Sequence, residues 1–159
     1  KQFFFDIAEP ILENDGETHR YVGDQVVVTW PLGDQIENQR CLDCYFAIQD
    51  KIKKEASRYQ EKFGAVPGFR VGLHGGSVIA GECGDDKQEI VYYGDTVNTA
   101  ARVESACKTF ERPMLISLDL LKQIKLRGEY VVENLGAADL RGRSESLEIA
   151  TVERHANYR

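Results

Sequence analysis

The most informative stretch of this chain is V-Y-Y-G-D-T-V-N-T-A-A-R-V-E-S-A, residues 91–106. A strand-like run ends at Gly94-Asp95, and a helix-compatible segment follows it. Asn98 and Arg102 are four positions apart and therefore share one face of a helix. Arginine offers a planar fork of donors suited to phosphate oxygens, and asparagine adds an uncharged donor and acceptor. The pair is a candidate phosphate site near a helix start, although its spacing also fits a turn-capping Asn98 and a solvated Arg102.

The chain has 159 residues, which favours a single domain over 1–159. Its net charge of −6 argues against general nucleic-acid binding, which needs a basic face. We find no apolar run of transmembrane length and no signal peptide at the start of the sequence. We therefore expect a cytoplasmic domain that does not itself contact a membrane, within a parent protein that could be membrane-associated.

The four cysteines are too few for a disulfide scaffold of this size. Cys41 and Cys44 have C-x-x-C spacing, but no second pair of cysteines or histidines accompanies them to complete a zinc site. We expect the cysteines to be small buried apolar residues in a reducing compartment, in preference to redox or metal-binding groups.

Hydrophobic periodicity and turn residues divide the chain into alternating helices and strands. Helices are predicted over 2–13, 35–63 and 118–126, and a further helix follows Gly94-Asp95 and carries Asn98 and Arg102. Strands are predicted over 17–22, 25–30, 69–73, 77–81, 88–93, 114–117, 130–134 and 147–152. Ser117 is the predicted N-cap of the last helix. Several strands are joined by short turns, so the pattern indicates an α/β or α+β sandwich with a mixed sheet.

Asp24 follows Gly23 at the tip of the predicted 17–30 hairpin. A carboxylate in that place could hold Mg²⁺, which needs few protein ligands, although aspartate also favours turns for its backbone hydrogen bonds. Arg141 and Arg143 are a compact basic pair on a predicted turn. They could neutralise a polyphosphate or lie in solvent beside acidic neighbours.

The glycines near residues 72–81 permit a tight turn and a close approach of the backbone. Their spacing matches neither a phosphate loop ending in Gly-Lys-Ser/Thr nor a dinucleotide-binding fingerprint. No Ser-His-Asp or Cys-His constellation is evident.

Three blocks of sequence together resemble the catalytic domain of class III nucleotide cyclases, the adenylate and guanylate cyclases. The blocks are H-R-Y-V-G-D-Q-V-V-V-T-W (19–30), F-R-V-G-L-H-G-G-S-V-I-A-G-E-C-G (69–84) and Y-Y-G-D-T-V-N-T-A-A-R-V-E-S (92–105). Their order and spacing match, and the similarity extends over nearly the whole chain. The resemblance implies the nucleotide cyclase fold: an α+β, ferredoxin-like-derived α/β sandwich with a mixed, mainly antiparallel sheet.

The resemblance also implies a reaction. In this family the 3′-hydroxyl of ATP or GTP attacks its own α-phosphate to give a 3′,5′-cyclic nucleotide and pyrophosphate, for intracellular signalling. Two divalent ions, Mg²⁺ or Mn²⁺, are held by two aspartates. Asp24 matches the second of these, and Asn98 and Arg102 match the pair that orients the ribose and stabilises the transition state. Arg141 or Arg143 falls where the family binds the triphosphate.

One departure concerns the metal site. The family's other metal aspartate stands on an opening strand, in a motif like Phe-x-Asp-Ile, far ahead of the Gly-Asp hairpin. Phe4-Phe5-Asp6-Ile7 imitates that motif, but Asp6 lies within the first predicted helix and only 18 positions before Asp24. We therefore do not assign Asp6 to the metal. The opening strand and its aspartate are expected upstream of Lys1, so residues 1–159 would be an N-terminally incomplete domain.

A second departure concerns the base. Adenylate cyclases usually place Lys four positions before the hairpin aspartate and Asp or Thr seven positions before the asparagine. Here Arg20 and Val91 stand at those positions, and they match guanylate cyclases no better. Arg20 can donate to an adenine ring nitrogen, but Val91 cannot hydrogen-bond an exocyclic amine. We expect ATP as substrate, with GTP as the alternative.

One chain carries both Asp24 and the Asn98/Arg102 pair, which fits a symmetric homodimer with two composite sites. A regulatory or sensor domain in the parent protein is compatible with this organisation. The alternatives are a cyclase-homology domain that binds nucleotide or serves regulatory dimerisation without turnover, and a ferredoxin-like regulatory module.

Overall fold

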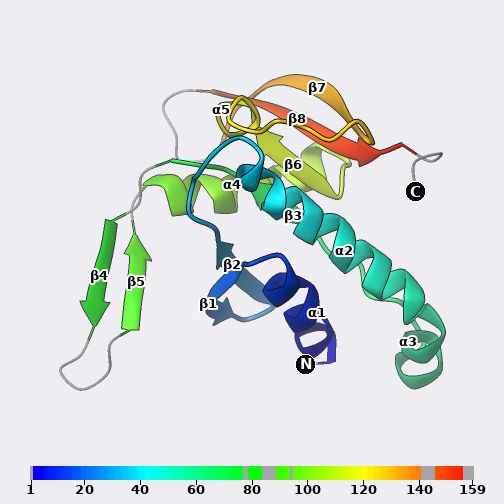
Figure 1. The fold of residues 1–159 in the computed structure, drawn as a ribbon. Helices are drawn as coiled ribbons and strands as arrows, with labels where there is room; N and C mark the ends of the chain where they lie inside the picture. The colour runs from blue at the N-terminus through cyan, green and yellow to red at the C-terminus, as the bar shows by residue number, and fades with distance from the viewer. Residues whose placement is uncertain (1, 77–78, 84–88, 94, 141–145, 156–159) are drawn as a thin grey trace. The chain divides into compact units, whose positions relative to one another are not determined.

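The computed structural model describes residues 2–76, 79–83, 89–93, 95–140 and 146–155, with side chains except at 20–22, 79–83, 89–93 and 95. The chain divides into two compact units, each described by itself below. The first comprises residues 1–33 and 37–69, and the second comprises residues 34–36 and 70–159. Figure 1 traces the helices and strands in chain order.

The first unit begins with helix α1 (Gln2–Glu13), as the apolar spacing predicts. Its inner face buries Ile7 and Ile11 against helix α2 (Arg40–Lys54). The core of this unit is apolar and partly aromatic; it consists of Ile7, Ile11, Cys44, Ile48, Ile52 and Tyr59, with Phe3, Phe4, Val26, Val28, Trp30 and Phe69 packed against it. Pro10 is accommodated inside the helix and is itself buried.

Strands β1 (Glu17–Val22) and β2 (Gln25–Thr29) form the predicted antiparallel hairpin. Val22 pairs with Gln25, so Gly23 and Asp24 are the two turn residues. Gly23 has a φ of 60°, a left-handed conformation that glycine adopts without steric cost.

The predicted helix over 35–63 is wrong in its continuity. A short 3₁₀ turn, η1 (Glu37–Gln39), leads into α2, and a separate helix α3 (Ala56–Phe63) follows. Glu55 has left the helical conformation between them, with φ −96° and ψ 10°. The segment contains neither proline nor glycine, so local propensity gives no sign of this break.

The second unit contains a four-stranded sheet in the order β3-β6-β8-β7, visible in the upper part of Figure 1. Its strands are β3 (Val71–Leu73), β6 (Met114–Ser117), β7 (Tyr130–Ala138) and β8 (Leu147–Arg154). The β3–β6 pair is parallel and the other two pairs are antiparallel. Strands β4 (Ile79–Cys83) and β5 (Glu89–Tyr93) form a separate antiparallel hairpin. The prediction of a mixed, mainly antiparallel α+β sandwich is confirmed.

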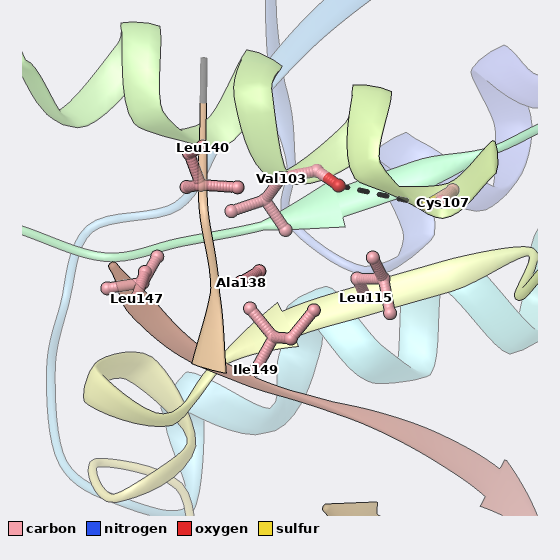
Figure 2. Close-up of a cluster of buried hydrophobic side chains, with 7 residues drawn as sticks. All are labelled: Val103, Cys107, Leu115, Ala138, Leu140, Leu147 and Ile149. Atoms are coloured by element: carbon pink, nitrogen blue, oxygen red, sulfur yellow. Dashed lines mark hydrogen bonds between the residues drawn. The ribbon is translucent and has the colours of Figure 1, made fainter. Parts of the chain in front are cut away.

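Helix α4 (Asp95–Phe110) packs on strands β3 and β6. Figure 2 shows Val103 and Cys107 of this helix directed toward Leu115 of β6 and Ile149 of β8. Ala138, Leu140 and Leu147 complete the same cluster from the far end of the sheet. This apolar contact joins α4 to the sheet.

Several predicted boundaries in the second unit differ from the structure. Strand β4 continues to Cys83 rather than ending at 81, and β7 continues to Ala138 rather than ending at 134. Helix α5 (Leu118–Leu121) stops well before the predicted residue 126. Its predicted N-cap is confirmed, because Ser117 Oγ accepts from the Leu120 N–H at 3.3 Å. The described residues contain no helix with the length and apolar character of a membrane span.

Candidate active site

Helix α4 presents Asn98 and Arg102 beside its buried stripe. Thr99, Val103 and Cys107 recur every four residues and are fully or almost fully buried. Asn98 and Arg102 each precede a stripe residue by one position, which places them about 100° around the helix from the core. Asn98 is exposed and Arg102 is half-buried. The two side chains therefore begin on neighbouring turns of one helix face, about 6 Å apart along the axis.

Gly72 lets strand β3 approach the backbone of α4 directly. A Cβ atom at Gly72 would lie 2.3 Å from the amide nitrogen of Glu104 and 2.7 Å from the carbonyl oxygen of Ala100. No side chain fits in that space, so only glycine permits this approach. Ala100 and Glu104 lie on the turns that carry Asn98 and Arg102, and β3 thus supports the helix at the candidate site.

Asp24 lies at the turn of the β1–β2 hairpin and is exposed. Its carboxylate forms no hydrogen bond or ion pair with any residue that the structure describes. Mg²⁺ is commonly held by one or two carboxylates with water and phosphate oxygens as further ligands, so Asp24 fits the role of one metal ligand. Within the described ranges, no group of three or more His, Cys, Asp or Glu side chains gathers to hold a metal ion.

For the remaining predicted site residues, the structure describes the backbone alone or does not describe the residue. Arg20 is in β1 and Val91 is in β5, but their side chains are not among those described. Arg141 and Arg143 lie outside the described residues. Asp24 belongs to the first unit, whereas Asn98 and Arg102 belong to the second.

Asp6 is buried in α1, only 6% exposed, and is fully engaged there. Its carboxylate accepts from Arg58 Nη2 at 2.7 Å, from Gln2 Nε2 at 3.1 Å and from the Tyr59 hydroxyl. Burial acts to raise the pKa of Asp6, but the hydrogen bonds from Tyr59, Arg58 and Gln2 outweigh it and hold the pKa below its usual value. Asp6 is therefore a structural carboxylate that joins α1 to α3.

The cysteines with described side chains are free thiols buried in the interior. Burial raises the pKa of Cys41 and Cys44 to about 12 and that of Cys107 to about 11. Thiols with such pKa values hold almost no thiolate near neutral pH and are poor nucleophiles and metal ligands. The prediction of small buried apolar residues is confirmed for these three.

Neither the partners of Asp6 nor the contacts of the turn after β3 are evident in the sequence. Arg58 and Tyr59 are more than 50 positions from Asp6, so no local pattern links them. The glycines at 72, 75 and 76 did signal close backbone approach, but not which helix they approach.

Comparison with known proteins identifies the family. The sequence profile of the adenylate and guanylate cyclase catalytic domain matches residues 3–153. Adenylate cyclase 2 of Rhizobium meliloti (strain 1021) is 40% identical over 151 residues, which cover 95% of this chain and 42% of that protein. Adenylate cyclase 1 of the same organism is 29% identical over 155 residues, covering 94% of this chain and 23% of that protein. The chain thus spans less than half the length of these relatives.

Solved structures show the same fold. The adenylyl cyclase CyaB from P. aeruginosa superposes with a TM-score of 0.81 at 21% identity, covering 98% of this chain and 81% of that one. The guanylate cyclase domain of RhGC from Catenaria anguillulae, in complex with GTP, gives a TM-score of 0.70 at 22% identity, covering 97% of this chain and 81% of that one. With the profile match over most of its length, the chain belongs to the family of adenylate and guanylate cyclase catalytic domains.

Proposed function

We propose that this domain converts ATP, with GTP as the alternative substrate, to a 3′,5′-cyclic nucleotide and pyrophosphate at the interface of a homodimer. The observation that carries the proposal is the face of α4, where an exposed Asn98 and a half-buried Arg102 stand on neighbouring turns of a helix fixed to the sheet by its buried stripe. The family match over residues 3–153 supports the reaction class.

In the proposed reaction the ribose 3′-oxygen forms a bond to the α-phosphorus, and the bond from that phosphorus to the oxygen bridging to the β-phosphate breaks. Pyrophosphate leaves with the electron pair, and the 3′-hydroxyl proton passes to water. Arg102 would donate to the α-phosphate oxygens, on which negative charge accumulates in the transition state. Asn98, one turn earlier, would hold the ribose so that its 3′-oxygen faces the phosphorus.

Asp24 would hold a divalent ion, Mg²⁺ or Mn²⁺, because it is exposed and its carboxylate forms no hydrogen bond or ion pair with another described side chain. When bound, such an ion lowers the pKa of the attacking hydroxyl and neutralises phosphate charge. The full site in our proposal contains two ions. Its second aspartate would come from chain preceding Lys1, because the carboxylate of Asp6 is already bound by Arg58, Tyr59 and Gln2.

The homodimer is part of the proposal because each chain carries one copy of each half-site. In a two-fold dimer, Asp24 of one protomer and the Asn98/Arg102 pair of its partner would form one site, and the symmetry repeats it. Arg141 or Arg143 would hold the terminal phosphates of the nucleotide. A site that consumes ATP or GTP suits the cytoplasm, and a regulatory or sensor domain elsewhere in the parent protein would control it.

The choice between ATP and GTP depends in our proposal on the residues that face the base. Arg20 would donate to a ring nitrogen of the base, whereas Val91 offers the base no hydrogen bond. The relative that is 40% identical is named an adenylate cyclase, which favours ATP. Retinal guanylyl cyclase 2 of Mus musculus is 38% identical but over only 47% of this chain, so GTP remains the second substrate to be assayed.

A second candidate function is nucleotide binding or regulatory dimerisation without turnover. Val91 favours it, because a valine at the base-selecting position removes a hydrogen bond on which discrimination depends. The Asn98/Arg102 pair favours the enzyme, because a module that only binds has no need of a transition-state pair.

The direct test is to incubate the purified full-length protein with ATP and with GTP, in Mg²⁺ and in Mn²⁺, and to measure cyclic nucleotide and pyrophosphate. We expect cyclic AMP and pyrophosphate in equal amounts, with slower formation of cyclic GMP. Nucleotide binding by a verified dimer without either cyclic product would contradict the enzyme and support the second candidate.

A further inference from the structure

The turn that follows β3 is connected to helix α5 through a buried hydrogen bond. His74 Nδ1 lies 2.7 Å from Ser117 Oγ, and Ser117 is completely buried at the end of β6. The same hydroxyl oxygen accepts the Leu120 N–H and thereby caps α5. One serine thus joins the turn to the start of the next helix.

The bond from Leu120 leaves the hydroxyl proton of Ser117 available to His74. A hydroxyl has one proton to donate, and its oxygen already accepts the Leu120 N–H. A buried donor without an acceptor is costly, and an unprotonated His74 Nδ1 lies within reach of the hydroxyl proton of Ser117. In that arrangement Ser117 donates, His74 accepts at Nδ1, and the neutral imidazole carries its proton at Nε2.

A side chain at either of the next two residues of the turn would press on a neighbouring side chain, which would have to shift. A Cβ atom at Gly75 would lie 2.9 Å from Leu120 Cδ1 of α5. A Cβ atom at Gly76 would lie 2.8 Å from Thr96 Oγ1 in the first turn of α4. The turn therefore lies against α5 on one side and against the start of α4 on the other.

The contacts of Gly72 and Gly76 flank the Asn98/Arg102 pair along α4. Gly76 contacts the helix at Thr96, before Asn98, and Gly72 contacts it at Ala100 and Glu104, on either side of Arg102. The segment of β3 and its turn from Gly72 to Gly76 thus follows the same two turns of α4 that carry the pair. On the glycine side each contact is made by backbone, so rotation of a side chain there cannot relieve it.

We infer that the turn His74–Gly76 positions the first two turns of α4, and that His74 and Ser117 are positioning residues for cyclisation. The inference rests on the proposed function of Asn98 and Arg102. The hydrogen bond between His74 and Ser117 holds the turn against α5. The turn then limits the positions that the start of α4 can take. A shift of about 1 Å at such a pair is enough to lower turnover by up to about 100-fold.

The first test, in the full-length protein, introduces a steric clash with one substitution and relieves it with a second. Gly76→Ala introduces a Cβ that presses on Thr96, and Thr96→Ala removes the side-chain atoms that it would meet. We expect Gly76→Ala to lower kcat about 10- to 100-fold in the wild-type background, with KM for ATP changed less than about threefold. In the Thr96→Ala background the same substitution should have little further effect. Gly68→Ala is the matched control, because nothing lies within 4 Å of that site.

The second test separates the hydrogen bond from the shape of residue 74. Asn places its Oδ1 at the same bond separation from Cβ as His74 Nδ1 and can accept from Ser117, whereas Leu cannot. His74→Asn should therefore keep most of the wild-type kcat, and His74→Leu and Ser117→Ala should each lower it about tenfold. Equal losses in His74→Asn and His74→Leu, or no loss in His74→Leu, would overturn the inference.

Hydrogen–deuterium exchange of the peptide spanning residues 96–104 gives a readout that needs no turnover. Gly76→Ala and His74→Leu should speed exchange in that peptide, and Thr96→Ala should cancel the effect of Gly76→Ala. Unchanged exchange in both single variants would overturn the positioning claim even where kcat falls. If the wild-type protein makes no cyclic nucleotide, the proposed function fails while exchange still decides the positioning claim.

Discussion

Arg102 is the residue whose loss should affect turnover most specifically. Arg102 is half-buried and lies on the same face of α4 as the exposed Asn98. We expect Arg102→Ala and Asn98→Ala each to lower kcat about 100- to 1,000-fold, because each removes a donor aimed at charge or geometry that develops in the transition state. The measurement is the initial rate of cyclic AMP formation by the full-length protein.

Lys108→Ala is the matched control for Arg102→Ala. It removes a positive charge from the same helix, at an exposed position two turns nearer its end. Its kcat should stay within about twofold of the wild type. A similar loss in Lys108→Ala would mean that charge on α4, rather than the Arg102 position, controls the rate.

Asp24→Asn tests the metal ligand at the tip of the β1–β2 hairpin. Because Asp24 is exposed and forms no hydrogen bond or ion pair with another described side chain, the change should leave the free energy of unfolding within about 0.5 kcal/mol of the wild type. Activity should fall at least about 100-fold, and the Mn²⁺ concentration for half-maximal rate should rise. Glu13→Gln, an equal change of charge at another exposed position, should alter neither quantity.

At this scale the sequence predicts chemistry better than contacts. The spacing of Asn98 and Arg102 alone places them on one helix face, and Gly23-Asp24 alone indicates a turn. In the sequence, only its place in a predicted helix and its short separation from Asp24 set Asp6 apart from the metal site. Only the fold shows that Arg58 and Tyr59, far along the chain, bind the carboxylate of Asp6.

At the scale of elements, the contact between α1 and α3 depends on Asp6. Its carboxylate is buried and accepts from Arg58 and Tyr59, and Arg58 also lies over the Tyr59 ring at 4.9 Å from the centroid. Asp6→Asn should lower the free energy of unfolding by about 1–3 kcal/mol, because it leaves donors of the network without a charged acceptor. Lys51→Ala, which removes the surface pair with Glu9, should cost less than about 1 kcal/mol.

The Asp6 contribution should depend on pH in a defined direction. The folded-state pKa of Asp6 is lowered, so its contribution is complete above the unfolded-state pKa of about 4 and is lost as pH falls through the folded value. The pKa of Tyr59 is raised to about 12, first by burial and then by Asp6, so its contribution is complete below about pH 10 and is lost as pH rises toward 12. Urea unfolding of the wild type and Asp6→Asn should therefore differ constantly from pH 5 to 9 and converge below pH 4.

The core beneath α4 should show the cost of a cavity. Leu115 of β6 is fully buried where the sheet packs against α4 (Figure 2). Leu115→Ala should lower the free energy of unfolding by about 2–5 kcal/mol in urea denaturation. Val131→Ala, at an exposed position of β7, should change it by less than about 0.5 kcal/mol. Equal effects at the two sites would contradict the packing described for α4.

The elements themselves could be predicted from periodicity, but several of their ends could not. The break at Glu55 lies among good helix formers, and it accompanies the contacts of Arg58 and Tyr59 with α1. Strand β7 passes Gly136 through a register shift at a positive φ of 86°, where the sequence suggests an end. Helix α5 stops early because the following backbone turns back, with Lys125 N–H bonding to Gln35 O. Each of these boundaries differs from its prediction where the structure makes a tertiary contact that the local sequence does not encode.

At the scale of the whole molecule, the proposed site requires two copies of the chain. Asp24 and the Asn98/Arg102 pair belong to separate units of one protomer, and in the proposed dimer each would work with the opposite half-site of the partner. Sedimentation of the full-length protein with ATP and Mn²⁺ should give a dimer, and activity per chain should fall on dilution as the dimer dissociates. Constant activity per chain in a monomeric sample would contradict the composite site.

Complementation between two inactive variants tests the central claim most directly. Asp24→Asn and Arg102→Ala damage opposite halves of the proposed site, and a mixed dimer would contain one intact site and one doubly damaged site. If the subunits exchange freely at equal concentrations, half of the dimers are mixed, so cyclic AMP formation should recover to about a quarter of the wild-type rate. Each variant mixed with wild-type chain provides the exchange control. No recovery in the mixture of variants, with exchange verified, would contradict a cyclase site shared between two protomers.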